Sequence, residues 1–295
     1  PLIVYNGYDE GDYLVIPRGC YDELISQLSV AGVRYDVVDK RQKGRKIDIH
    51  FNGDLYSEQQ IAAEKMLYND IGVLAAATAF GKTVLGAYLI AEKKVNALVL
   101  VHNVEIMNNW IKDLSSFLTI NEELPTYTTP KGRVKKRSSL IGTFSSQKDS
   151  TTGIIDIAMI TSLGREDNIN ELVRNYGMVI VDECHHAAAV THENVLRAVT
   201  AKYVYGMSAT INRGDKQDKK MFMQLGPIRH RYTAKERAQK QGIGHYIYPR
   251  FTRLVDLNQS EDKNPSDYYR LIMQSELRNM QIVSDVIDCV KRGRT

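Results

Sequence analysis

The stretch Ile71–Thr83 constrains the fold of this chain more than any other, because it predicts a strand, a tight loop and a helix in immediate succession. An apolar run suited to a buried strand leads into Gly81-Lys82-Thr83, and a helical pattern follows over Val84–Lys94. This order is typical of a phosphate-binding loop. There, backbone N–H groups and the positive helix end face the phosphates, the lysine neutralises charge and the threonine hydroxyl reaches Mg²⁺. The general pattern has glycine at the position of Ala76, so an ordinary strand–helix turn is the alternative.

From residue 55 onward the pattern alternates between apolar strands and helices. Strands are expected at Gly72–Ala76, Ala97–Val101, Ile155–Ile160, Met178–Asp182 and Tyr203–Met207, with a short one at Ile228–Tyr232. Helices are expected at 58–68, 83–94, 104–118, 168–175 and 192–200. Apolar strands without alternation, separated by helices, indicate a parallel sheet that is covered on both faces. Ligands of such sheets bind beyond the carboxyl ends of the strands, where Lys82 and the pair Asp182-Glu183 can meet.

Asp182-Glu183 is the second feature that carries chemistry. Two adjacent carboxylates at the end of an apolar strand are costly unless they have partners. In a nucleotide site the first can hold Mg²⁺ through its water shell, and the second can orient and deprotonate the attacking water. A solvated Asp-Glu turn is the alternative, and the upstream Gly-Lys-Thr loop weakens it.

The flanking regions carry no catalytic pattern. Residues 1–50 suggest a small α/β unit, with strands near 13–17, 33–38 and 46–51 and a helix at 21–29. The basic cluster Lys40–Lys46 is interpreted as a hairpin tip, either solvated or in contact with nucleic acid. Residues 126–152 are interpreted as a loop, either solvated or acting as a basic arm on phosphates. A long helix is expected at 266–290.

Composition adds few limits. A net charge of +4 permits a polyanionic partner without requiring one. The three cysteines, Cys20, Cys184 and Cys289, have no paired spacing, so we expect no zinc site or disulfide framework and a reducing, cytoplasmic location. The longest apolar runs are about half of the roughly 20 residues that span a bilayer, so no membrane partner is expected. No initiator methionine is present, so we expect the chain to begin inside a longer protein.

The order and spacing of three motifs resemble those of superfamily 2 helicases. Gly81-Lys82-Thr83, Asp182-Glu183-Cys184-His185 and Ser208-Ala209-Thr210 correspond to motifs I, II and III of that family. Residues 55–59 resemble the segment whose glutamine contacts adenine, and residues 98–103 and 159–163 resemble motifs Ia and Ib, which grip the nucleic-acid backbone. The motif II form and the residues that follow motif III look most like type III restriction-enzyme motors and DNA-repair and transcription helicases. The resemblance covers roughly 55–232.

The resemblance implies a role for each matched residue. It implies catalytic roles for Glu183, Asp182 and Lys82, and Mg²⁺ binding by Thr83 and Asp182. Nucleotide binding is implied for Gln59, Thr78, Ala79, Phe80, Gly81, Lys82 and Thr83. Coupling between the ATP site and the nucleic acid is implied for His185, Ser208 and Thr210. Nucleic-acid binding is implied for His102, Asn103, Thr161, Ser162 and Arg213. The cofactors implied are ATP and Mg²⁺. The partner implied is DNA, single-stranded or duplex, and the residues alone do not exclude RNA.

Three positions depart from the family pattern. Ala79 stands where the helicase loop usually has glycine, and an alanine with φ > 0 there costs about 1–2 kcal/mol of strain. Asn103 stands where relatives often carry a basic residue. Arg213-Gly214-Asp215 stands where repair-type relatives have Arg-Glu-Asp. Trp110 fits the apolar face of helix 104–118 and is interpreted as a core residue.

We therefore predict a RecA-like P-loop NTPase of α/β class, with a central, mostly parallel sheet and a small N-terminal α/β module. The predicted parts are an accessory module at 1–50, an ATP-binding helicase domain at 51–245, and a linker with the start of a truncated second RecA-like domain at 246–295. The predicted function is an ATP-dependent DNA helicase or translocase. The alternatives are a non-unwinding restriction-type translocase and a nucleotide-binding module with weak ATPase activity.

Overall fold

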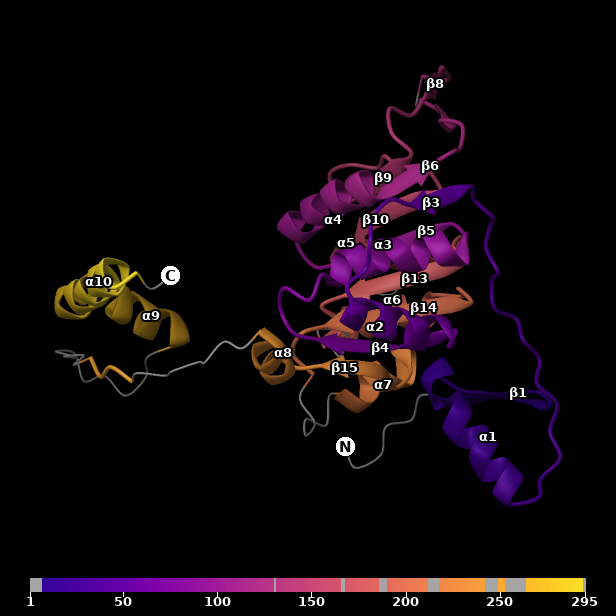
Figure 1. Ribbon diagram of the computed structural model, residues 1–295. Helices are drawn as coiled ribbons and strands as arrows, with labels where there is room; N and C mark the ends of the chain where they lie inside the picture. The colour runs from indigo at the N-terminus through magenta and orange to yellow at the C-terminus, as the bar shows by residue number, and fades with distance from the viewer. Residues whose placement is uncertain are drawn as a thin grey trace. The chain divides into compact units, whose positions relative to one another are not determined.

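The computed structural model describes residues 7–129, 131–165, 168–185, 190–211, 218–241, 249–252 and 264–293. Two compact units make up the chain, Pro1–Gln241 and Gly242–Thr295. Figure 1 shows the elements of both units.

A seven-stranded sheet is the centre of the first unit. Its strand order is β15-β4-β14-β13-β5-β10-β9, and every neighbouring pair is parallel. The strands are β4 (Ile71–Ala76), β5 (Ala97–Val101), β9 (Ile141–Phe144), β10 (Ile155–Met159), β13 (Met178–Asp182), β14 (Tyr203–Ser208) and β15 (Ile228–Tyr232). The expected parallel α/β sheet is confirmed, and the six strands expected for it lie within two residues of their observed bounds. The chain order requires a crossover between β4 and β5, so both strands deliver their carboxyl ends to one edge.

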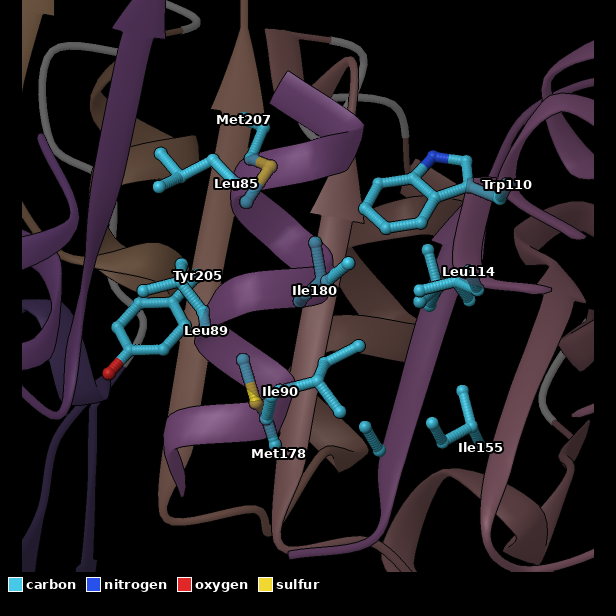
Figure 2. Close-up of a cluster of buried hydrophobic side chains, with 14 of the residues drawn as sticks. Leu85, Leu89, Ile90, Trp110, Leu114, Ile155, Met178, Ile180, Tyr205 and Met207 are labelled. Carbon is cyan, nitrogen blue, oxygen red and sulfur yellow. The ribbon is translucent and has the colours of Figure 1, made fainter. Parts of the chain in front are cut away.

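Helices cover both faces of the sheet (Figure 1). One face carries α2 (Ser57–Leu67), α3 (Lys82–Lys93) and α4 (Val104–Phe117), and the other carries α5 (Ile160–Leu163), α6 (Val190–Ala198) and α7 (Asp218–Leu225). Side chains alternate along β4, so Leu74 packs under α2–α4 whereas Val73 packs under α5–α7. Figure 2 shows the first core, in which Leu85 and Leu89 of α3 and Trp110 of α4 pack onto Ile180 and its neighbours in the sheet.

Two expectations for the connecting segments are wrong. Residues 126–152 are not a plain loop, because they form the hairpin β7 (Thr126–Thr128) and β8 (Val134–Lys136) and then β9, the outermost strand of the sheet. The segment 168–175 is not an α-helix. Its β12 (Asn168–Ile169) pairs with β11 (Gly164–Arg165), and a 3-10 turn follows at Glu171–Arg174. Weak apolar periodicity in both segments concealed these local structures from sequence reasoning.

The helix expected at 21–29 and the strands expected near 13–17 and 46–51 are present, but the strand expected at 33–38 is not. A hairpin of β1 (Tyr8–Glu10) and β2 (Tyr13–Val15) precedes a 3-10 turn at Arg18–Cys20 and α1 (Tyr21–Val30). Residues 33–38 contain no strand, and β3 (Ile49–Phe51) pairs with β6 (Leu118–Ile120).

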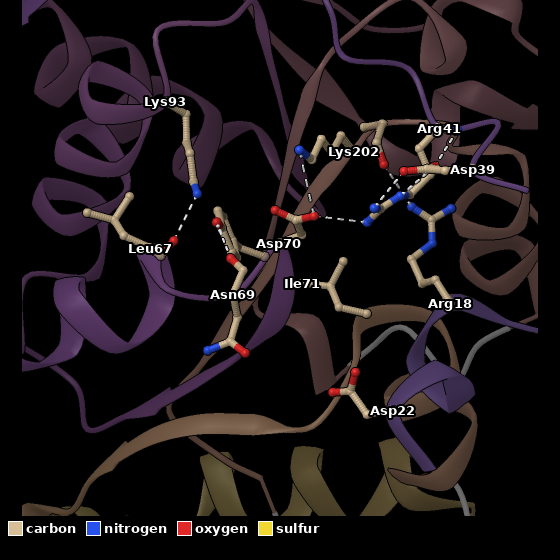
Figure 3. Close-up of polar contacts among 12 residues, drawn as sticks. Arg18, Asp22, Asp39, Arg41, Leu67, Asn69, Asp70, Ile71, Lys93 and Lys202 are labelled. Atoms are coloured by element: carbon tan, nitrogen blue, oxygen red, sulfur yellow. Dashed lines mark hydrogen bonds and ion pairs between the residues drawn. The ribbon is translucent and has the colours of Figure 1, made fainter. Parts of the chain in front are cut away.

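Residues 39–47, which we name the brace segment, cross the edge where the central strands begin. Gln42 N–H donates to Thr200 O at 2.8 Å just before β14, and Asn96 N–H donates to Arg45 O at 2.8 Å just before β5. The basic cluster is therefore not a hairpin tip. In Figure 3, Arg41 pairs with Asp39 at 2.8 Å and with Asp70 at 3.2 Å. The guanidinium of Arg41 thus pairs with carboxylates of the protein itself, at the sheet edge opposite the loop between β4 and α3.

The second unit contains two helices among its described residues, α9 (Pro265–Gln274) and α10 (Glu276–Lys291). The single helix expected at 266–290 is therefore interrupted at Ser275. Within the described part of the chain, no helix is both long and apolar enough to cross a membrane.

Candidate nucleotide and nucleic-acid site

The loop between β4 and α3, for which phosphate binding is predicted, has two residues in the left-handed region. Gly81 has φ 81° and precedes the first residue of α3, and Ala79 has φ 63°. Because the φ of Ala79 is positive, this alanine carries about 1–2 kcal/mol of backbone strain. Two features require glycine at position 81. Its φ is positive, and a Cβ there would clash with the side-chain amide of Gln59. Thr78 and Ala79 are exposed, whereas Phe80 is buried.

Gln59 lies against this loop from α2. It is 3% exposed, its Oε1 accepts from Tyr56 N–H at 3.0 Å, and its Nε2 donates to Phe80 O at 2.8 Å. The first bond is half of a capping box that begins α2, and the second ties the helix to the phosphate loop. The adenine contact implied for Gln59 stays a prediction.

Lys82 and Glu183 meet at the carboxyl ends of β4 and β13, as expected from the order of the strands. Lys82 Nζ lies 3.7 Å from Glu183 Oε1, and the side chains are 13% and 24% exposed. Glu183 has φ 46°, a left-handed backbone that turns the chain sharply as it leaves β13. A partly buried cation beside a partly buried carboxylate can hold a phosphate and an attacking water side by side.

Asp182 receives two hydrogen bonds, one on each carboxylate oxygen. Trp110 Nε1 donates to Oδ2 at 2.8 Å, and Glu183 N–H donates to Oδ1 at 2.9 Å. Burial raises the pKa of Asp182, and the indole N–H opposes that shift because it stabilises the ionised form. Trp110 is a core residue, as expected, but sequence reasoning missed its contact with Asp182. Only the indole N–H of the lone tryptophan offered a signal.

The three residues implied in coupling form one hydrogen-bonded cluster with Glu183. His185 Nδ1 lies 2.9 Å from Ser208 Oγ and 3.2 Å from Glu183 Oε2. Ser208 Oγ also donates to Glu183 Oε2 at 3.3 Å and accepts from Thr210 N–H at 3.2 Å. The ends of β13 and β14 are thus connected through side chains. These hydrogen bonds can transmit a displacement of one strand end to the other.

Cys184 lies beneath this cluster and does not join it. The side chain is buried against Gly206 of β14, and burial raises the pKa of the thiol. A protonated, enclosed thiol is a packing group rather than a nucleophile or a metal ligand.

Four of the five residues implied in nucleic-acid binding lie farther along the same edge. Asn103 accepts from Ile106 N–H at 2.8 Å and so caps α4, and its Nδ2 is 3.2 Å from His102 Nε2. After β10, Thr161 is exposed and Ser162 Oγ accepts from Ser146 N–H at 3.0 Å. The capping bond explains why asparagine is suited to position 103. Arg213 lies outside the described residues.

The oxygen atoms near the loop suit Mg²⁺. No group of three or more His, Cys, Asp or Glu side chains gathers into a metal site among the residues that the structure describes. Mg²⁺ in nucleotide sites needs fewer protein ligands, because water and phosphate oxygens complete its octahedron. The carboxylate of Asp182 keeps a free lone pair on each oxygen, and the hydroxyl of the half-buried Thr83 lies on the first turn of α3.

Comparison with known proteins identifies relatives of this chain. The family model described as "Type III restriction enzyme, res subunit" matches residues 52–213. A protein of Acanthamoeba polyphaga mimivirus, named as a candidate ATP-dependent RNA helicase, is 26% identical over 237 residues, which are 78% of this chain and 40% of that protein. A DNA 3'-5' translocase of Sulfurisphaera tokodaii is 22% identical over 187 residues, which are 63% of this chain and 38% of that protein. The chain therefore spans about 40% of the length of these relatives.

The fold has a counterpart among solved structures. The crystal structure of the UvsW helicase from bacteriophage T4 has a TM-score of 0.51 and 13% identity, over 74% of this chain and 80% of that chain. At this identity the similarity concerns the fold alone.

Proposed function

The chain belongs to the family of type III restriction enzyme res subunits and has a superfamily 2 helicase RecA-like domain, and from this premise we propose that it is the ATP-hydrolysing motor domain of a DNA helicase or translocase. One observation carries the proposal. Lys82 Nζ and Glu183 Oε1 are 3.7 Å apart beside the phosphate loop, and Glu183 is hydrogen-bonded onward to Ser208. A phosphate-binding cation, a base and a relay to the neighbouring strand are therefore contiguous.

In the proposed reaction the amides that follow Ala79 and the ammonium of Lys82 bind the nucleotide phosphates. Mg²⁺ when bound neutralises charge on the phosphate oxygens, and Thr83 and Asp182 would hold it. Trp110 keeps the carboxylate of Asp182 oriented through the 2.8 Å bond to its Oδ2. Glu183 orients the attacking water and takes its proton.

Lys82 and Glu183 pair with each other in this structure, and the pair suggests how substrate prepares the site. Nucleotide phosphates would compete for the ammonium of Lys82, because they carry more charge than one carboxylate. Glu183 would then be released toward water while His185 and Ser208 still hold its second oxygen. The base is thereby available only when phosphates are present.

The nucleic-acid track is proposed at the ends of β5 and β10, with His102, Asn103, Thr161 and Ser162 facing the strand backbone. Hydroxyls, amides and helix ends are the groups that contact phosphates without reading sequence. We propose DNA as the partner because the translocase of Sulfurisphaera tokodaii is named for DNA, with RNA as an outcome of the test. We also propose that the protein acts in the cytoplasm and that residues 51–245 form the motor domain. Residues 246–295 would begin a second RecA-like domain, which completes the ATP site in helicases.

The test is ATP hydrolysis by the full-length protein with single-stranded DNA, duplex DNA, RNA and no nucleic acid. We expect strong stimulation by DNA, and a loss of turnover on the order of 10³-fold in Glu183→Gln with ATP binding retained. Lys82→Ala should lose binding as well. A full-length ATPase that Glu183→Gln leaves untouched would falsify the catalytic assignment. If RNA stimulates ATP hydrolysis more than DNA does, RNA and not DNA is the substrate.

A non-unwinding translocase is the second candidate, and the restriction-enzyme family model favours it. Such a motor displaces the third strand of a triplex but does not separate a duplex. Strand-displacement and triplex-displacement assays on the same preparation separate the two outcomes. The third reading, a binding module with weak ATPase, rests on the strained Ala79, and DNA-stimulated turnover in the first test would exclude it.

A further inference from the structure

Two side chains from different helices donate hydrogen bonds to carbonyl groups of the loop between β4 and α3. Gln59 Nε2 of α2 donates to Phe80 O at 2.8 Å, and Arg237 Nη1 donates to Thr78 O at 2.8 Å. Arg237 belongs to α8 (Ala234–Gln241), the last helix of the first unit, and to none of the motifs recognised in the sequence.

The two bonds determine where the amides of the loop point. All described peptide bonds are trans, so the C=O and N–H of one peptide unit point in opposite directions. Because Thr78 O points to α8, the N–H of Ala79 points away from α8. In the same way, Gly81 N–H points away from Gln59. Ala77 N–H is already bound to a backbone carbonyl, Tyr232 O, at 2.9 Å.

The strand order shows what lies on the side that Ala79 N–H faces. β4 lies between β15 on one side and β14 and β13 on the other. α8 directly follows β15, which lies on the side of β4 opposite to β13. We therefore infer that Ala79 N–H faces the side of β13 and Glu183. On this inference, the bond from Arg237 turns an amide of the loop toward the side on which Lys82 and Glu183 meet.

Arg237 acts from a fixed support. Thr233 and Glu236 form a capping box at the start of α8, with Thr233 N–H donating to Glu236 Oε2 at 2.6 Å and Glu236 N–H donating to Thr233 Oγ1 at 3.2 Å. Lys240, one turn beyond Arg237, pairs with Glu58 of α2. The helices that carry Arg237 and Gln59 are thus connected to each other.

We propose that Arg237 is a positioning residue of the nucleotide site, which holds the strained left-handed turn at Ala79 in the conformation that binds phosphate. Glycine would adopt this turn without strain, whereas alanine relaxes away from it unless the carbonyl before it is held. The hydrogen bond from Arg237 thus stabilises the left-handed turn at position 79, which a glycine there would adopt without support. The inference rests on the proposed nucleotide binding.

The first experiment compares Arg237→Ala with Lys235→Ala, which removes an exposed cation from the same helix. Binding of N-methylanthraniloyl-ADP with Mg²⁺ is measured by fluorescence titration on the 295-residue chain. We expect Kd to rise about tenfold in Arg237→Ala, equivalent to about 1.4 kcal/mol, and to change less than twofold in the control. The melting temperature should stay unchanged, because water can reach the carbonyl of the exposed Thr78. Unaltered binding by Arg237→Ala would overturn the inference.

The second experiment separates positioning from simple charge attraction. Arg237→Ala is repeated in an Ala79→Gly background, where the turn needs no support. The loss of affinity should shrink to threefold or less, because glycine keeps the left-handed turn populated. An equal loss in both backgrounds would mean that Arg237 acts by its charge alone, and the positioning role would be rejected.

Lys82→Ala distinguishes a failure of this inference from a failure of the proposed function. If the unaltered chain binds the nucleotide and Lys82→Ala does not, the site stands, and Arg237→Ala decides the inference alone. If the unaltered chain does not bind the nucleotide, both are overturned.

Discussion

Replacement of Trp110 by phenylalanine tests whether the hydrophobic core positions the carboxylate of Asp182, for which we propose a role in Mg²⁺ binding. Trp110 lies on the buried face of α4 and is 1% exposed, and its Nε1 donates to Asp182 Oδ2 at 2.8 Å. Phenylalanine keeps an aromatic ring in the core but has no donor. One oxygen of a largely buried carboxylate would then lose its partner, while the other keeps the bond from Glu183 N–H.

The expected cost has two parts. A hydrogen bond to a charged acceptor contributes about 1.5–3 kcal/mol. The smaller ring also leaves a void beside Gly86, on which the indole packs, and this adds on the order of 1 kcal/mol. We therefore expect the free energy of unfolding to fall by about 3 kcal/mol, which lowers the melting temperature of a unit this size by on the order of 10 °C.

Leu114→Ala is the matched control, because Leu114 is 0% exposed on the same helix and forms no bond with Asp182. It should cost a similar amount, about 2–5 kcal/mol. Urea denaturation measures both losses. Only Trp110→Phe should raise the Mg²⁺ concentration that gives half-maximal nucleotide binding, by on the order of tenfold. If both variants have the same Mg²⁺ dependence, the indole does not position Asp182 and the reasoning is wrong.

Three further predictions concern other parts of the first unit. Gly81→Ala should abolish nucleotide binding in titration calorimetry while circular dichroism stays unchanged, and retained binding would contradict the left-handed cap. Tyr176→Phe removes the 2.5 Å bond to the fully buried Asp156 and should lower the free energy of unfolding by about 2 kcal/mol in urea without altering ATPase activity. Arg41 lowers the pKa of Asp39 from 3.8 to about 2. The unfolded chain therefore binds more protons between these values, and stability present above pH 4 is lost as pH falls toward 2. Asp39→Asn should remove this part of the acid sensitivity, and an identical pH profile of unfolding would refute it.

The parts of the fold that could be predicted are those with a characteristic pattern in a short stretch of the sequence. Long apolar runs identified five central strands, and helical periodicity identified α2, α3, α4 and α6 to within two residues at each end. The meeting of Lys82 with Glu183 also followed, because a parallel sheet brings the carboxyl ends of its strands to one edge. β9 did not follow, because an edge strand of four residues with one buried position has almost no pattern of its own.

Another wrong prediction concerned basic side chains that were expected to face solvent or to contact nucleic acid. Lys40–Lys46 resembles a solvated turn in sequence, yet its Arg41 is paired with Asp70, and its backbone bonds to residues just before β5 and β14. Partners that lie tens of residues away in the chain leave no trace in local composition. The same is true of Arg237, which contacts Thr78 from 159 residues away.

By itself, the sequence determined the class of the fold, the strand, loop and helix over Ile71–Thr83 and the adjacent carboxylates at the end of β13, since residue type and short spacing decide whether a strand, a left-handed turn or a pair of acids can exist at a given place. Only the tertiary structure decided which groups support them. The indole of Trp110 on Asp182, the glutamine and arginine on the loop carbonyls and the brace segment across the sheet edge are all long-range contacts. Each depends on how helices pack onto the sheet, and packing depends on the whole core rather than on any one stretch.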